Sequence, residues 1–85
     1  MMFTYTPGPW EIHPHQAQIV RAPNAGYFIA DTFAHGRTAA NAALISAAPD
    51  LLEALQDLLQ QLDSSSATKI NTSRALTAIS KAWGD

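Results

Sequence analysis

The histidines and serines are the residues whose types and spacing could carry chemistry. His13 and His15 lie two apart, so on a strand they could present two imidazoles to a zinc or nickel ion. Pro14 interrupts regular strand geometry between them, and only His35 could supply a third nitrogen ligand. The serines at 64–66 have no histidine base at a spacing that would activate a nucleophile. We therefore expect exposed or loop histidines, and a serine loop that caps a helix.

A run of carboxylates offers a second chemical possibility. Asp50, Glu53 and Asp57 recur at helical spacing and could bind a cation or form an acid–base pair. Such a run is more often the solvated face of a helix, with its first carboxylate favouring the helix N-terminus. Because the chain contains no cysteine, a disulfide, a thiolate metal site and a cysteine nucleophile are excluded. We expect no catalytic residue, no metal, no cofactor and no enzymatic activity.

The arginines suggest a binding site rather than a catalytic one. Arg21, Arg37 and Arg74 are candidate ligand-binding residues, because a basic pocket for a phosphate or a nucleotide could form across a subunit interface. The formal net charge of the chain is -2. Since nucleic-acid binders are usually basic, we do not expect a nucleic-acid partner.

The length of the chain predicts one domain and self-association. A chain of 85 residues accommodates a single core, so residues 1–85 are expected to form one domain. The hydrophobic fraction of 47% excludes a disordered composition. A core of this size barely offsets the conformational entropy of folding, and oligomerisation is then a common remedy. We expect a homo-oligomer, most simply a dimer.

Two expectations concern location. The longest apolar run is only a few residues, so we expect no membrane-spanning segment. The first five residues have neither the basic nor the hydrophobic region of a secretory signal. The expected location is therefore the cytoplasm.

Residues 1–36 have the pattern of a small antiparallel sheet. Strands are predicted at Trp10–His13, Ala17–Ala22 and Tyr27–Phe33, where apolar, β-branched and aromatic residues gather. Residues 23–26 read Pro-Asn-Ala-Gly, which predicts a turn that joins the second and third strands as a hairpin. The buried face of the third strand is ambiguous, because both of its faces carry apolar side chains.

Residues 37–85 have the pattern of three helices. The first is expected over Thr38–Ala47, and Pro49 either kinks it or separates it from the next. Leucines then recur at three- and four-residue spacing to position 62, which predicts an amphipathic helix. The last helix is expected over Ala67–Trp83. The expected fold class is α+β, with a small antiparallel sheet of two or three strands followed by three helices packed on one face.

Several large apolar residues are candidates for an interface. The leucine stripe is wide, and one sheet face does not cover both of its edges. Trp10 and Trp83 lie near the termini and are interpreted as core residues or as interface anchors, with the core favoured. The interface candidates are Trp10, Leu51, Leu55, Leu58, Leu62 and Trp83.

Two segments carry a resemblance. Residues 6–10 read TPGPW, and residues 41–55 read NAALISAAPDLLEAL. Together they resemble a family of small bacteriophage and prophage proteins with a TPGPW opening and a central run similar to NARLIAAAPDLLEAL. Ala43 stands where the family often has arginine, so no role of that arginine is carried over. The resemblance implies a phage or prophage origin and action in the bacterial cytoplasm, but no activity.

These observations lead to two functional hypotheses. The first is a phage-encoded accessory protein that acts by protein–protein interaction and inhibits a host defence or regulatory factor. This hypothesis rests on origin and small size rather than on chemistry. The alternative is a sponge-like oligomer that binds a small molecule or a nucleotide.

Overall fold

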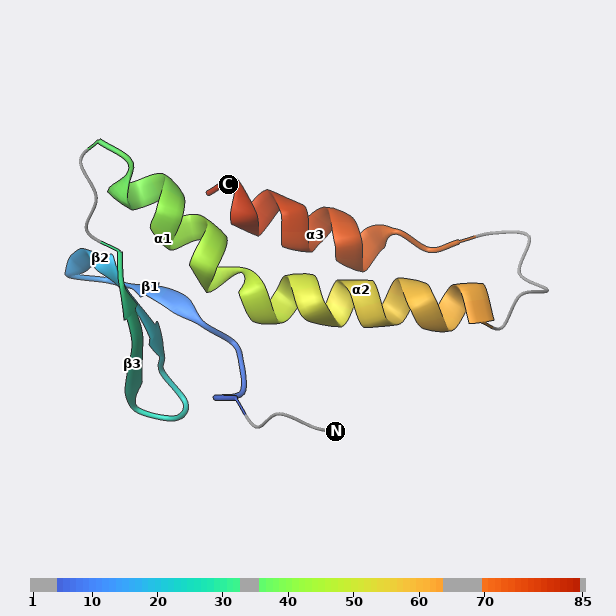
Figure 1. The fold of residues 1–85 in the computed structure, drawn as a ribbon, viewed down its shortest axis with the longest axis horizontal. Coiled ribbons are helices and arrows are strands. Elements are labelled where there is room, and N and C mark those ends of the chain that lie inside the picture. Colours follow the sequence, from blue (N-terminus) through green and yellow to red (C-terminus); the bar gives the residue numbers. More distant parts are fainter. Residues whose placement is uncertain (1–4, 33–35, 64–69, 85) are drawn as a thin grey trace.

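The computed structural model describes residues 5–32, 36–63 and 70–84. It contains a three-stranded antiparallel sheet followed by three helices, which confirms the expected α+β class (Figure 1). The strands are β1 (Glu11–His13), β2 (Gln16–Ala22) and β3 (Tyr27–Asp31). The helices are α1 (Thr38–Ser46), α2 (Ala48–Asp63) and α3 (Ser73–Ala82). The predicted strand end at Phe33, His35, the serines at 64–66 and the predicted helix start at Ala67 lie outside the described residues.

The sheet has the order β1-β2-β3, and the predicted hairpin joins β2 to β3. The turn is closed by Gly26, whose N–H donates to the carbonyl of Ala22 at 2.9 Å. Gly26 has a φ of 75°, a conformation that glycine adopts without the steric cost of a side chain.

A bulge in β3 resolves which face of the sheet is buried. Val20 pairs with Ala30, whereas the next residue, Arg21, pairs with Phe28, so β3 has one extra residue between them. The alternation of faces therefore reverses within β3, so neither set of alternate residues faces the core along the whole strand. Val20 and Ala22 are buried, while Phe28 is exposed beside Arg21.

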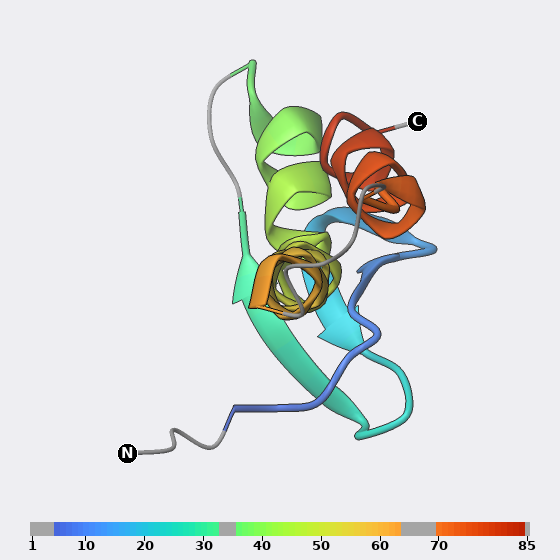
Figure 2. The same cartoon turned by 90° about the vertical axis from the view of Figure 1, so that its right-hand side faces the viewer.

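Helix α1 links the sheet to the other helices. It contacts β1 and β2 on one side and α3 on the other, while α2 extends away from the sheet (Figures 1 and 2). The core at these contacts consists largely of small residues, which allow helix backbones to approach closely. Its buried hydrophobic members are Ile19, Val20, Ala22, Ala42, Ala43, Ala47, Ala54 and Ala78.

Pro49 separates two helices. Helix α1 ends at Ser46, Ala47 forms a one-residue junction, and α2 begins at Ala48. Pro49 then occupies the first turn of α2, where a missing N–H costs no intrahelical hydrogen bond. The bend at this junction sends α2 away from the sheet (Figure 1).

Helix α3 begins later than the periodicity predicts. Residues 70–72 are not helical, and the helix starts at Ser73. The Gln61 side chain accepts a hydrogen bond from the Asn71 N–H at 2.6 Å and donates one to its carbonyl at 2.7 Å. The Asn71 side chain in turn accepts a hydrogen bond from the Ser73 N–H at 2.9 Å. These side-chain bonds hold the Asn71 backbone out of the helix and satisfy one donor of its first turn.

Candidate interaction surface

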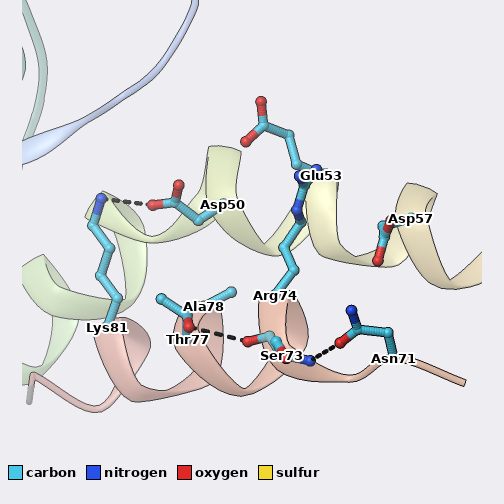
Figure 3. Close-up of a pocket in the computed structure, with 9 residues that line it drawn as sticks. All are labelled: Asp50, Glu53, Asp57, Asn71, Ser73, Arg74, Thr77, Ala78 and Lys81. Carbon is cyan, nitrogen blue, oxygen red and sulfur yellow. Dashed lines mark hydrogen bonds and ion pairs between the residues drawn. The ribbon is translucent and has the colours of Figure 1, made fainter.

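Helices α2 and α3 form an antiparallel hairpin (Figures 1 and 2). The two flanks of this hairpin carry different side chains. One flank is an open cleft of about 710 Å³ (Figure 3). The cleft is lined by Asp50, Glu53, Asp57, Asn71, Ser73, Arg74, Thr77, Ala78 and Lys81. We call this side the polar cleft.

The polar cleft contains a connected ion pair. The ammonium group of Lys81 lies 2.6 Å from a carboxylate oxygen of Asp50 and also donates to the carbonyl of Trp10 at 2.9 Å. One side chain thus ties α3 to the start of α2 and to the segment before β1. The three carboxylates that were considered for cation binding lie here, with Asp50 engaged by Lys81. Among the described residues, no group of three histidines or carboxylates is placed to hold a metal ion.

Removing the Lys81 ammonium group should therefore lower stability. We expect Lys81→Met to reduce the free energy of unfolding by about 1–2 kcal/mol, a value discounted for the partial solvent exposure of the pair. The measurement is urea unfolding followed by circular dichroism. The matched control is Arg74→Met, a cation of the same cleft that is exposed, for which a loss below about 0.5 kcal/mol is expected. Equal losses in the two variants would contradict the proposed tie.

The opposite flank of the hairpin is apolar. Along α2, Leu52, Leu55, Leu59 and Leu62 follow one another at spacings of three, four and three residues, and all are exposed. Along α3, Leu76, Ile79 and Trp83 repeat the spacing of three and four. At 100° per residue, both stripes fall on the side of the hairpin away from the polar cleft. We call these seven residues the apolar flank.

Only some of the predicted interface residues lie on the apolar flank. Leu55, Leu62 and Trp83 belong to the apolar flank, and Trp83 is 78% exposed. Leu51 and Leu58 are half-buried at its inner edge. The favoured interpretation of Trp83 as a core residue is therefore wrong for the single chain, because Trp83 follows the last residue of α3 and its side chain is exposed.

Trp10 has a different environment from Trp83. It is half-buried, its indole N–H donates to the carbonyl of Thr6 at 3.0 Å, and it lines a small hollow with Tyr5, Pro49 and Leu52. It anchors the segment before β1 against the start of α2. The structure thus separates the two tryptophans, one in intramolecular packing and one on the surface.

The three candidate arginines lie at three separate places. Arg21 is on β2 and pairs with Glu11 at 3.1 Å, Arg37 is exposed just before α1, and Arg74 lines the polar cleft. Within one chain they do not form a basic pocket. The cleft that contains Arg74 also holds three carboxylates, which disfavour an anionic ligand.

A second exposed surface surrounds the β2–β3 turn. Tyr27 and Phe28 are 63% and 65% exposed, and they border a hollow of about 280 Å³ together with Arg21. The Phe28 ring meets the His13 ring edge-on, with centroids 5.8 Å apart. His13 itself accepts a hydrogen bond from the His15 N–H at 3.0 Å. We call Tyr27, Phe28, Arg21 and His13 the aromatic patch. Neither Tyr27 nor Phe28 was among the site residues expected from the sequence.

A comparison with protein families identifies the origin of the chain. The family described as Salmonella phage P22 protein Y8K6 matches residues 1–85. The chain belongs to this family. This match confirms, at the level of the family, the phage origin that the resemblance implies. No curated protein and no solved structure matches it. No described helix of the phage protein is long and apolar enough to cross a membrane.

Proposed function

We propose that this phage-encoded small protein acts in the cytoplasm of the bacterial host by binding a host protein through the aromatic patch. The observation that carries the proposal is the exposure of Phe28 beside its strand partner Arg21, with the exposed Tyr27 at the rim of the same hollow. Tyrosine, phenylalanine and arginine are enriched at the centres of protein–protein interfaces. The proposal assigns no catalytic step to the protein.

The aromatic patch has the rigidity that favours binding. Arg21 donates two hydrogen bonds to Glu11, at 3.1 and 3.2 Å, which hold the guanidinium in place. Phe28 is supported by the ring of His13. Because Arg21 and Phe28 already have these partners in the single chain, less conformational entropy is lost when a host protein docks on them.

The class of the partner follows from the origin of the family. We propose that the partner is a host defence or regulatory factor and that the protein inhibits it. The support is the phage family and the exposed patch, so this step rests on origin rather than on site chemistry.

The experiment is a quantitative pull-down from host lysate with the wild type and a double variant, Tyr27→Ser with Phe28→Ser. We expect the wild type to enrich a host protein and the double variant to enrich it at least about tenfold less, since two hot-spot residues together contribute more than about 1.4 kcal/mol. The matched control is Leu44→Ser, an exposed apolar residue on α1, which should leave the capture unchanged. Equal capture by wild type and double variant, or no capture by the wild type, would overturn the proposal.

The alternative, a nucleotide-binding oligomer, can be separated by a thermal-shift panel of nucleotides. A ligand that binds the folded state raises the melting temperature in proportion to the logarithm of its concentration over Kd. We expect no nucleotide to stabilise the protein, because the cleft around Arg74 carries more carboxylates than cations. Stabilisation that disappears in Arg74→Ala would instead support the alternative.

A further inference from the structure

The apolar flank presents seven exposed large apolar side chains from α2, from α3 and from the residue that follows α3. Its leucines on α2 repeat at the three- and four-residue spacing that helices use to interdigitate with a second pair of helices. The five charged side chains described on the hairpin all line the polar cleft on the other side. Covering this flank therefore desolvates no described charge.

The exposed area of the chain exceeds that of a compact monomer of the same mass. The accessible surface is 6355 Å², whereas a compact chain of this mass exposes about 4,900 Å². The radius of gyration is 14.8 Å, compared with roughly 12 Å for a compact domain of this length. The excess surface is larger than the roughly 800 Å² that each partner buries in a standard interface.

We propose that a second copy of this chain covers the apolar flank, so that two α2–α3 hairpins form a four-helix bundle. A twofold axis places the same patch of each copy against the other, and a flank that is apolar along its whole length is complementary to itself. Leu55 and Leu59 then lie in the bundle core, and Trp83 anchors its edge. The aromatic patch belongs to the sheet, which contacts α1, and so stays outside this interface (Figure 1).

The identity of the occupant follows from area and charge together. A net charge of -2 on each copy opposes association only weakly, and the described charges face away from the flank. The chain alone has a small core of mainly alanine side chains, so burial of seven large apolar residues supplies what the single copy lacks. A second copy of the chain would bury these seven residues and would meet only weak charge repulsion.

The experiment is light scattering coupled to size-exclusion chromatography on the wild type and on Leu55→Gln with Leu59→Gln. We expect the wild type at twice the chain mass of 9.1 kDa and the variant at the chain mass. Because these leucines are 60% and 64% exposed, their replacement removes little packing within one chain, and circular dichroism should show unchanged helix content. The control is Tyr27→Ser with Phe28→Ser, which should remain a dimer.

A cysteine test keeps the proposal falsifiable should the glutamine variant fail to fold. The chain has no cysteine, so each introduced thiol is the only one present. We expect at least one of the single variants Leu52→Cys, Leu55→Cys and Leu59→Cys to form a covalent dimer with a bis-maleimide. The variant Glu53→Cys, whose thiol lies in the polar cleft, should form none. A wild-type mass of one chain, an assembly larger than two chains, or cross-linking from the cleft alone would overturn the proposal. A further outcome would assign the flank to a host partner instead. In that case the wild type is a monomer that captures a host protein, and the variant with Leu55→Gln and Leu59→Gln no longer captures it.

Discussion

Replacement of Val20 by aspartate is expected to unfold the protein. Val20 lies on the central strand, pairs with Ile12 on one side and Ala30 on the other, and is the largest fully buried side chain among the described residues. The neighbouring cation, Arg21, points to the other face of the sheet and is paired with Glu11. A buried carboxylate without a partner costs about 3–5 kcal/mol, which is comparable to the whole stability of a small domain. The measurement is far-ultraviolet circular dichroism with urea titration.

A graded pair of variants separates burial from a general effect on the sheet. Val20→Thr keeps the shape but buries a hydroxyl, so we expect a loss of about 1–3 kcal/mol. Ile12→Thr makes a similar change on the paired strand at a side chain that is 36% exposed, and a smaller loss is expected. A cooperative transition for Val20→Asp at the wild-type urea midpoint would contradict this account of the core.

The sequence predicted most of the elements because their signals are local. The turn at residues 23–26, the aromatic third strand and the leucine periodicity each depend on neighbouring residues, and each appears in the structure. The start of α3 depends instead on Gln61, which is ten residues from its partner Asn71. Periodicity contains no information about that hydrogen bond, and so it predicted the helix too early.

The candidate surface was predicted only in part, for a related reason. Hydrophobicity suggests that leucines fill the core, but Ala54 on α2 and Ala78 on α3 are buried while most leucines of these helices are exposed. Helical spacing defines an apolar arc without saying which part of it meets a neighbour. The spacing therefore does not distinguish the exposed leucines from the half-buried ones. Leu52 and Leu59 are exposed, whereas Leu51 and Leu58 are half-buried. The arginines could not be placed relative to one another, because they lie on three elements.

Replacement of Gly8 by alanine is expected to be the most destabilising change in the segment before β1. A Cβ atom at Gly8 would lie 2.9 Å from the Cβ of Pro49, closer than such atoms approach in folded proteins. The proline ring is fixed to its backbone in the first turn of α2, so the contact cannot be relieved by a side-chain rotation. This contact joins the two segments on which the phage resemblance rests. We expect a loss of about 1–3 kcal/mol in the free energy of unfolding, measured by urea titration.

A double-mutant cycle tests whether Pro49 is the cause. Pro49→Gly removes the opposing Cβ, and although it lowers stability itself, Gly8→Ala should cost much less in that background. Pro7→Ala, at the exposed neighbouring position, controls for changes in the unfolded segment and should cost little. If Gly8→Ala costs the same with and without the Pro49 side chain, the packing of the first segment on α2 is not what makes glycine necessary there. If the coupling is present, the docking of residues 6–10 on the start of α2 contributes to stability through Gly8 and Pro49, neither of which belongs to the apolar flank.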